Sequence, residues 1–479
     1  MSVDEGEDVR EERRAPALTR RNRLDDLAVT IACIGFQLDR IVVRAQRLGE
    51  SHAVGRIDDG IGRAGGEQHR RFVAGDEIDR QRLSAQRGRE DVRHVRFAWR
   101  NGRIRAGEPD HPAQFRLRHA LRREIARLGG LYNAHLHLCR SGTLEETEKI
   151  LAAGDSEQYS HLSIPKKHGL IPLIHASPAY DRANIRQRVS AYLEVMRRAG
   201  TTRADTLVDV TADRVGMSAM EELLKLKEEY RGTLDLQLGS YTPMGFKDSE
   251  PRRWDLVARA AEVADFVGSL PERDGHDLYP DHIGYEENCR RTLLLAQRHN
   301  KQIHIHVDQK NDPDEHGTET LLSVIDELGI TYPAGEPMVW LIHVISPSAY
   351  DEMRFKDLCE AMAGHNIGVI CCPSAAISMR QLRPMATPTH NSIARVMEFL
   401  AAGVPVRIGS DNIDDITSPA GTPDLMHELF VLTNAVRFYD MGIIAKIGAG
   451  QPLDEADRQL IRQHLERDAQ EVAKAMGKR

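Results

Sequence analysis

The sequence lacks the features of a membrane protein and of a protein held together by disulfides. No apolar run approaches the roughly 20 residues that a membrane-spanning helix needs, and the charged start MSVDEGEDVREERR is unlike a signal peptide. The 479 residues include only six cysteines, none in a CxxC pair, which predicts free thiols in a reducing compartment. A net charge of −7 does not favour a dedicated nucleic-acid binder. We therefore expect a cytoplasmic protein that binds neither membranes nor nucleic acid.

Lysine is absent from the first 130 residues, although this stretch contains 27 arginines. With 21 acidic residues its net charge is +6, and its apolar residues show little periodicity. Three interpretations stay open: a poorly ordered arm, a stretch that is not the native N-terminus, and a basic arm that binds nucleic acid. We treat residues 1–129 as an atypical N-terminal extension and assign them no function.

Beyond this stretch, short apolar runs rich in β-branched residues alternate with longer amphipathic ones, as in a parallel sheet with crossover helices. The sequence predicts eight strands, at 131–138, 204–210, 233–241, 265–270, 302–309, 338–346, 367–374 and 404–412. Eight strand–helix units in about 310 residues predict an α/β fold, a (β/α)8 TIM barrel over residues 130–450. An open doubly wound sheet is the rival, but no glycine fingerprint follows the first strand. Residues 451–479 are expected to form a C-terminal helical extension.

Polar residues interrupt these apolar runs near their carboxyl ends, where barrels of this kind carry their active sites. His135 and His137 lie two residues apart on the first run, so both face inward. His306, His343 and Asp411 lie near the ends of the fifth, sixth and eighth runs. Imidazoles with one carboxylate suit one divalent ion, Zn2+ or Fe2+, and leave a position for a water whose pKa falls to about 7. The pattern predicts a metal-dependent hydrolase in which Asp411 also handles protons.

The other histidines and cysteines are expected to be structural. His304 lies two residues before His306 and is interpreted as a core residue. Cys371 and Cys372 are expected to pack as small buried hydrophobes. Seven histidines in predicted loops or helices are expected at the surface: His161, His168, His276, His282, His316, His365 and His390.

Taken in order, the motifs resemble the amidohydrolase superfamily, and within it the cytosine-deaminase-like branch, over residues 130–440. They are NAHLHL with SGTLEE, VGSLPERD, LAQRHNKQIHIHVDQKND, WLIHVIS, CCPSAAISMRQ and RIGSDNIDDITSPAGTPDLM. The resemblance implies that His343 orients or polarises the attacked centre. No lysine ends the fourth strand, so a bridged two-metal centre is not expected. The resemblance also implies that one metal is held by His135, His137, His306 and Asp411.

The sequence departs from that branch at three positions. The branch has a proton-shuttling glutamate three residues after the fifth-strand histidine, but here the residue is Gln309, whose amide cannot transfer a proton on demand. A substrate-reading glutamine after the third strand is replaced by Thr242, Pro243 or Met244, and an acidic residue after the metal-binding aspartate by Asn412. We therefore predict that the substrate is bound by Gln309, Met244 and Asn412. The predicted catalytic residues are His343, Asp411 and Gln309.

The resemblance implies that metal-bound hydroxide attacks a carbon bearing nitrogen in a small cyclic or N-heterocyclic substrate, not a peptide. Deamination and cyclic-amide hydrolysis stay open, because Gln309 replaces the residue that would have decided between them. The alternative is a catalytically impaired or non-catalytic barrel with a damaged N-terminus, since an apolar lead-in before the first strand and a terminal β-sandwich are both missing from the sequence. Barrels of this family often associate, so the resemblance is also compatible with a homo-oligomer.

Overall fold

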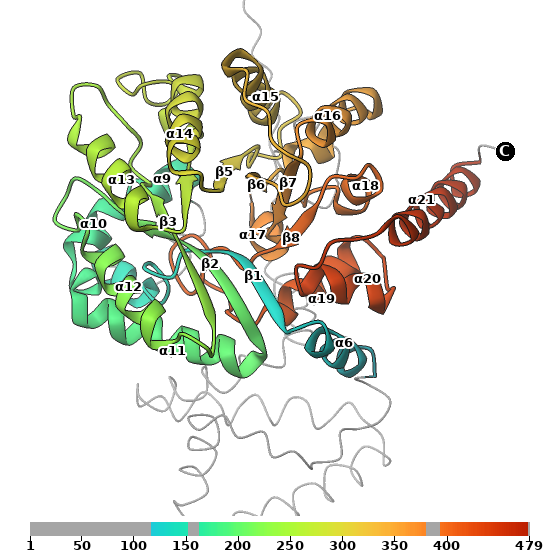
Figure 1. Ribbon diagram of the computed structural model, residues 1–479, viewed down its shortest axis with the longest axis horizontal. Helices are drawn as coiled ribbons and strands as arrows, with labels where there is room; N and C mark the ends of the chain where they lie inside the picture. Colours follow the sequence, from blue (N-terminus) through green and yellow to red (C-terminus); the bar gives the residue numbers. More distant parts are fainter. Residues whose placement is uncertain (1–115, 152–161, 380–392, 478–479) are drawn as a thin grey trace, which may run out of the picture. The chain divides into compact units, whose positions relative to one another are not determined.

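The computed structural model describes residues 116–151, 162–379 and 393–477. Eight parallel strands form one sheet in sequential order, with helices around it (Figure 1). The backbone N–H of Asp411 donates to the carbonyl of His135 (N···O 2.9 Å), and a parallel bridge joins Leu136 to Asp411, so the end of the sheet meets its beginning. The predicted (β/α)8 barrel is confirmed. Its strands are β1 Leu131–Leu136, β2 Thr201–Asp209, β3 Asp235–Tyr241, β4 Phe266–Ser269, β5 Ile303–Val307, β6 Val339–His343, β7 Ile367–Cys371 and β8 Val406–Ile408.

Helices follow the strands and cover the outside of the sheet (Figure 1). Those after β1 are α7 Leu144–Ile150, α9 Ile164–His168, α10 Ile171–Ala176 and α11 Arg182–Ala199. Those after β2 to β5 are α12 Ser218–Glu229, α13 Arg252–Val263, α14 Tyr285–His299 and α15 Gly317–Leu328. Those after β6 to β8 are α16 Glu352–Gly364, α17 Pro373–Ser378, α18 Val396–Ala401, α19 Leu425–Ala435 and α20 Met441–Gly448. Short 3-10 turns are η1 Pro178–Tyr180, η2 Pro271–Asp274 and η3 Ser346–Ala349.

Helix α11 is the long crossover between β1 and β2, and we did not predict it. Its buried residues are Ile185, Val189, Leu193 and Met196, spaced three or four apart on one face. That spacing is typical of an amphipathic helix packed on a sheet. Its C-terminus is marked by Gly200, whose φ of 96° lies in the left-handed region that favours glycine.

The interior of the barrel is filled by large side chains opposite glycines. Tyr132, Phe266 and Trp340 belong to one buried apolar cluster inside the sheet. A Cβ atom on Gly239 would lie 2.4 Å from Phe266 Cε2, and one on Gly368 would lie 2.4 Å from Trp340 Cζ3. Because glycine alone leaves room for these rings, the lower part of the barrel is solid and the carboxyl ends of the strands carry the open space.

Two further helices flank the barrel. Helix α6, Arg116–Arg127, contacts α20 and buries Leu121 and Ile125 in the main apolar cluster. It lies within the predicted extension 1–129, whose first 115 residues are outside the described part. Helix α21, Glu455–Ala475, begins with a capping box between Asp454 and Asp457. In the described segments, no helix is both long and apolar enough to cross a membrane.

Candidate metal centre

Four side chains from three parts of the chain meet at the carboxyl end of the barrel. His135 and His137 come from the end of β1, His306 from β5 and Asp411 from the loop after β8. Their candidate ligand atoms all lie within 4.8 Å of one another. Asp411 Oδ1 is 3.2 Å from His135 Nε2 and 3.4 Å from His137 Nε2. The structure therefore brings together the four residues that the sequence predicted as ligands, and all four are buried.

The backbone after β8 is shaped to place Asp411 over β1. Asp411 has a φ of 59°, in the left-handed region that non-glycine residues seldom occupy. The preceding residue, Ser410, is tied to β1 twice: its N–H donates to Asn133 Oδ1 (3.0 Å), and its hydroxyl accepts from Asn133 Nδ2 (2.8 Å). These buried bonds fix the turn and hold the carboxylate beside the histidines of β1.

The nitrogen atoms of this cluster are prepared to accept a ligand. His306 Nδ1 lies 3.1 Å from the carbonyl of Ser269, so Nδ1 carries the proton and Nε2 offers its lone pair to the cluster. His135 Nε2 is buried and makes no hydrogen bond within the described residues. Burial lowers the pKa of His306 and of His137 well below the usual value, which keeps both rings neutral. Because an unpaired buried polar atom is costly, this donor set fits a divalent metal ion.

His343 stands beside the cluster rather than within it. It ends β6 with a φ of 77°, and its Nε2 lies 3.8 Å from Asp411 Oδ2, the carboxylate oxygen that faces away from His135 and His137. Burial lowers the pKa of His343 to about 4. Burial alone would raise the pKa of Asp411, but its histidine neighbours outweigh it and hold that pKa well below the usual value. The pair is thus a neutral imidazole next to a carboxylate.

A cavity of about 780 Å3 adjoins the centre. Asp411 and Gln309 line it, together with Glu272 and Arg273 of η2, which we did not predict. Met244 is absent from the described lining of this cavity.

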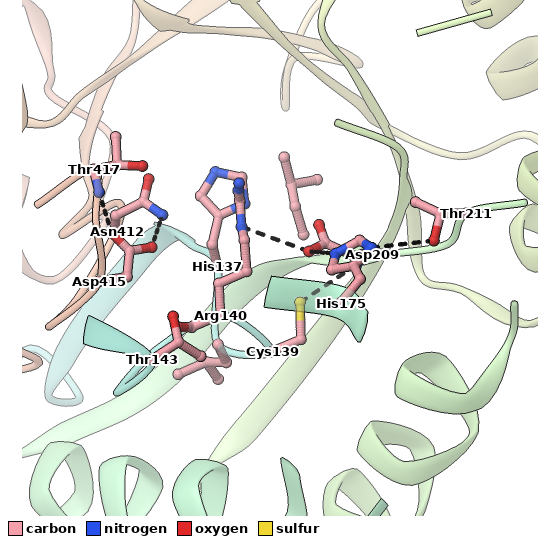
Figure 2. Close-up of polar contacts among 12 residues, drawn as sticks. His137, Cys139, Arg140, Thr143, His175, Asp209, Thr211, Asn412, Asp415 and Thr417 are labelled. Carbon is pink, nitrogen blue, oxygen red and sulfur yellow. Dashed lines mark hydrogen bonds and ion pairs between the residues drawn. The ribbon is translucent and has the colours of Figure 1, made fainter. Parts of the chain in front are cut away.

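Asn412 is likewise missing from the described lining, and its side chain is engaged elsewhere. Its amide donates to Asp415 Oδ2 at 2.5 Å, and Asp415 Oδ1 accepts from the backbone N–H of Thr417 (2.8 Å) and of Ser418 (3.0 Å) (Figure 2). Asn412 therefore braces the loop after β8. For Asn412, as for Met244, binding of substrate remains a prediction from the sequence.

Two histidines that we expected at the surface, His168 and His282, are not exposed, whereas His316 is exposed as expected. His168 and His316 line the cavity, and burial lowers the pKa of His168 to about 3. The side chain of His282 is only 6% exposed, and its Nδ1 lies 2.7 Å from the buried carboxylate of Asp274. The expectation was wrong for His168 and His282 because loops that follow barrel strands fold over the site rather than outward. Two other histidines lie outside the described residues: His161 and His390.

The remaining structural expectations hold. His304 is buried inside the barrel, with its ring centroid 4.2 Å from that of Phe266. Cys371 and Cys372 are buried free thiols, which agrees with a packing role.

A buried polar network contacts His137 on the side of its ring away from Asp411 (Figure 2). Arg140 Nη2 lies 2.5 Å from His137 Nδ1, so the guanidinium contacts the ring on the side away from Nε2, which lies 3.4 Å from Asp411 Oδ1. Arg140 Nε is also 3.6 Å from Asp209 Oδ2 at the end of β2. Burial alone would raise the pKa of Asp209, but Arg140 and the groups bonded to this carboxylate lower it to about 2.

His175 extends this network from α10. Its Nε2 is 3.2 Å from Asp209 Oδ2 and its Nδ1 is 2.7 Å from Asp213 Oδ2. Both ring nitrogens face carboxylates, so both donate and the ring is an imidazolium. Burial alone would lower the pKa of His175, but its bonds to the two carboxylates outweigh burial and raise that pKa. We did not predict this network, although Asp209 ends a strand as the metal-site residues do.

No family model matches the chain. An uncharacterized protein of Haemophilus influenzae is 28% identical over 287 residues, which cover 58% of this chain and 94% of that protein. A pterin deaminase of Rhizobium rhizogenes is 22% identical over 279 residues, and the match covers 58% of this chain and only 58% of that enzyme.

Among solved structures, a 5-methylcytosine deaminase from Klebsiella pneumoniae, liganded with phosphonocytosine, superposes with a TM-score of 0.56. It is 22% identical, and the match covers 67% of this chain and 73% of that chain. A second structure of that deaminase, liganded with 5-fluorocytosine, has the same TM-score at 23% identity, covering 67% of this chain and 72% of that chain. These likenesses confirm the fold.

Proposed function

We propose that this chain, whose barrel is that of the amidohydrolase superfamily, is a metal-dependent hydrolase of C–N bonds other than peptide bonds. The observation that carries the proposal is the buried group of three histidines and one aspartate beside the cavity. An impaired, non-catalytic barrel is not favoured, because β1 pairs with β2 at four positions from Leu131 to Leu136 and the His135 ring centroid lies 4.8 Å from that of His137 and 5.0 Å from that of His306.

The donor set suits one divalent ion, and both Zn2+ and Fe2+ accept imidazole and carboxylate ligands. When bound, such an ion activates water for attack on carbon at neutral pH. His135, His137, His306 and Asp411 would hold it. His343, whose Nε2 lies 3.8 Å from Asp411 Oδ2, would polarise the attacked group or orient the water.

The substrate we propose is a small cyclic or N-heterocyclic molecule. The cavity volume of about 780 Å3 lies in the usual range for small-molecule sites. The named relatives are deaminases of a pterin and of 5-methylcytosine, which makes release of ammonia the first reaction to test and hydrolysis of a cyclic amide the second. Gln309, which lines the cavity, would read the substrate through hydrogen bonds.

The test combines metal analysis with an activity panel. Purified protein should contain about one Zn or Fe per chain, and His306→Ala should lose it. Ammonia release would be measured on aminopyrimidines, pterins and aminotriazines, and ring opening on hydantoins and lactams. His276→Ala, an exposed histidine away from the cluster, is the control. A chain that binds no metal after supplementation would refute the proposal.

A further inference from the structure

A carboxyl group stands beside the metal centre without a role in the chemistry described so far. Glu272 lies in η2, directly after β4, and lines the same cavity as Asp411 and Gln309. β4 also supplies the carbonyl of Ser269 that holds His306 Nδ1. Glu272 is therefore carried by the strand end that orients one of the metal ligands.

Glu272 is paired with the residue that cannot transfer protons. Gln309 Nε2 donates to Glu272 Oε2 at 2.9 Å, and the backbone N–H of Gln309 approaches Oε1 at 3.4 Å. Gln309 itself follows the ligand His306 by three residues. An amide hydrogen-bonds but does not exchange a proton on demand, whereas a carboxyl does. The pairing places such a carboxyl one hydrogen bond away from Gln309.

The surroundings of Glu272 favour the protonated form of its carboxyl. Burial, followed by the charges of Glu315 and Asp308, raises the pKa of Glu272 well above its usual value, and Lys310 opposes this shift. The Tyr285 hydroxyl is another ionisable neighbour. A glutamic acid kept neutral by its site can donate a proton and then recover one.

Glu315 is the other cavity carboxyl with a raised pKa, but its oxygens are already engaged. Oε2 accepts from the Lys310 backbone N–H (2.9 Å) and from the Ser346 hydroxyl (2.5 Å). Oε1 lies 3.6 Å from Lys310 Nζ. Glu315 thus holds the loop after β5, whereas the oxygens of Glu272 accept from Gln309, a residue of the cavity lining.

We propose that Glu272 is the proton carrier of the hydrolysis proposed above, on which this inference rests. Its acid form donates a proton to the substrate nitrogen while water adds to the carbon, and the carboxylate recovers a proton from the oxygen of that water. When the C–N bond breaks, the electron pair stays on nitrogen, which leaves with a proton from Glu272. The carboxylate regains a proton from the added hydroxyl as it becomes a carbonyl, so Glu272 ends as it began.

The first test is Glu272→Gln, assayed with the best substrate of the panel. A glutamine keeps the shape and can still bond to the Gln309 amide, so the metal content and KM should stay near wild type. We expect kcat to fall about 100-fold or more, with loss of the limb of the pH–rate profile that reports the carboxyl. Glu262→Gln, an exposed carboxyl on α13 outside the described lining of the cavity, is the matched control and should keep its activity. A Glu272→Gln variant with wild-type kcat overturns the inference and leaves the hydrolase proposal intact.

The second test exchanges the pair. The double variant Glu272→Gln with Gln309→Glu restores one carboxyl and one amide. Its kcat should be at least about tenfold higher than that of Glu272→Gln alone. A double variant no better than Glu272→Gln overturns the inference.

The third test needs no turnover, so it applies even if the metal-loaded wild type acts on no substrate and the hydrolase proposal fails. Infrared difference spectra at neutral pH, wild type minus Glu272→Gln, should show the carbonyl band of a protonated carboxyl. Absence of that band overturns the inference.

Discussion

The buried network behind His137 makes Asp209 the most consequential residue outside the metal cluster. Asp209 is fully buried and faces Arg140, His175 and the hydroxyl of Tyr180, which donates to it at 2.6 Å. Asp209→Asn keeps the shape and removes the charge, so Arg140 is left buried without its carboxylate. Removal of one partner of a buried ion pair costs about 3–5 kcal/mol, and we expect this loss in the free energy of unfolding, measured with denaturant.

The same substitution should reach the metal through Arg140. Because Arg140 orients His137, its displacement should weaken metal binding about 10–100-fold, as for other groups that support ligands, in a competition titration with a chelating dye. The control is Asp213→Asn, whose side chain is 31% exposed and which contacts His175 only from the outer side. Asp213→Asn should lower the free energy of unfolding by less than about 1 kcal/mol. If both variants lose the same stability and the same metal affinity, the role assigned to this network is wrong.

Three further predictions concern pH, packing and metal. Because the pKa of His175 is raised in the folded state, the stabilisation of the fold by its protonated ring is complete below about pH 6.5 and is lost as pH rises through the folded-state pKa. The difference in free energy of unfolding between the wild type and His175→Gln should therefore become smaller toward alkaline pH. A difference that grows instead would contradict the imidazolium. Gly368→Ala should cost about 1–3 kcal/mol because its Cβ meets Trp340, whereas Gly364→Ala, with open space around it, should not destabilise; both are measured by denaturant unfolding. Chelation should lower the Tm in a thermal-shift assay and added metal should restore it, but not in His306→Ala.

The strands and the grouping of the four proposed metal ligands could be predicted from the sequence because both follow from local rules. Residues two apart on a strand, such as His135 and His137, point to the same face. The carboxyl ends of the strands of a barrel meet at one rim. The first strand lacked an apolar lead-in, yet Leu131 and Tyr132 are buried and the Leu131 N–H bonds to the carbonyl of Gly200. The support comes from a residue 69 positions away, which no local pattern contains.

The rest of the site depends on loop conformation and on contacts between distant segments. Nothing in PERD distinguishes Glu272 from a solvated turn residue until η2 folds it against Gln309. Likewise the pairing of His175 with Asp209 joins a helix and a strand end 34 positions apart. Helix α11 is different: its apolar residues recur every three or four positions in the sequence, so this helix could have been predicted.

The aromatic filling of the barrel has a kinetic consequence. Tyr132, Phe266 and Trp340 fill the barrel below the four proposed metal ligands, so the described side chains leave no opening through its lower end. In the hydrolase proposed above, a substrate would enter through the cavity above Asp411, and the product would leave by the same mouth. The two molecules would therefore compete for one space, and release of product would precede binding of the next substrate.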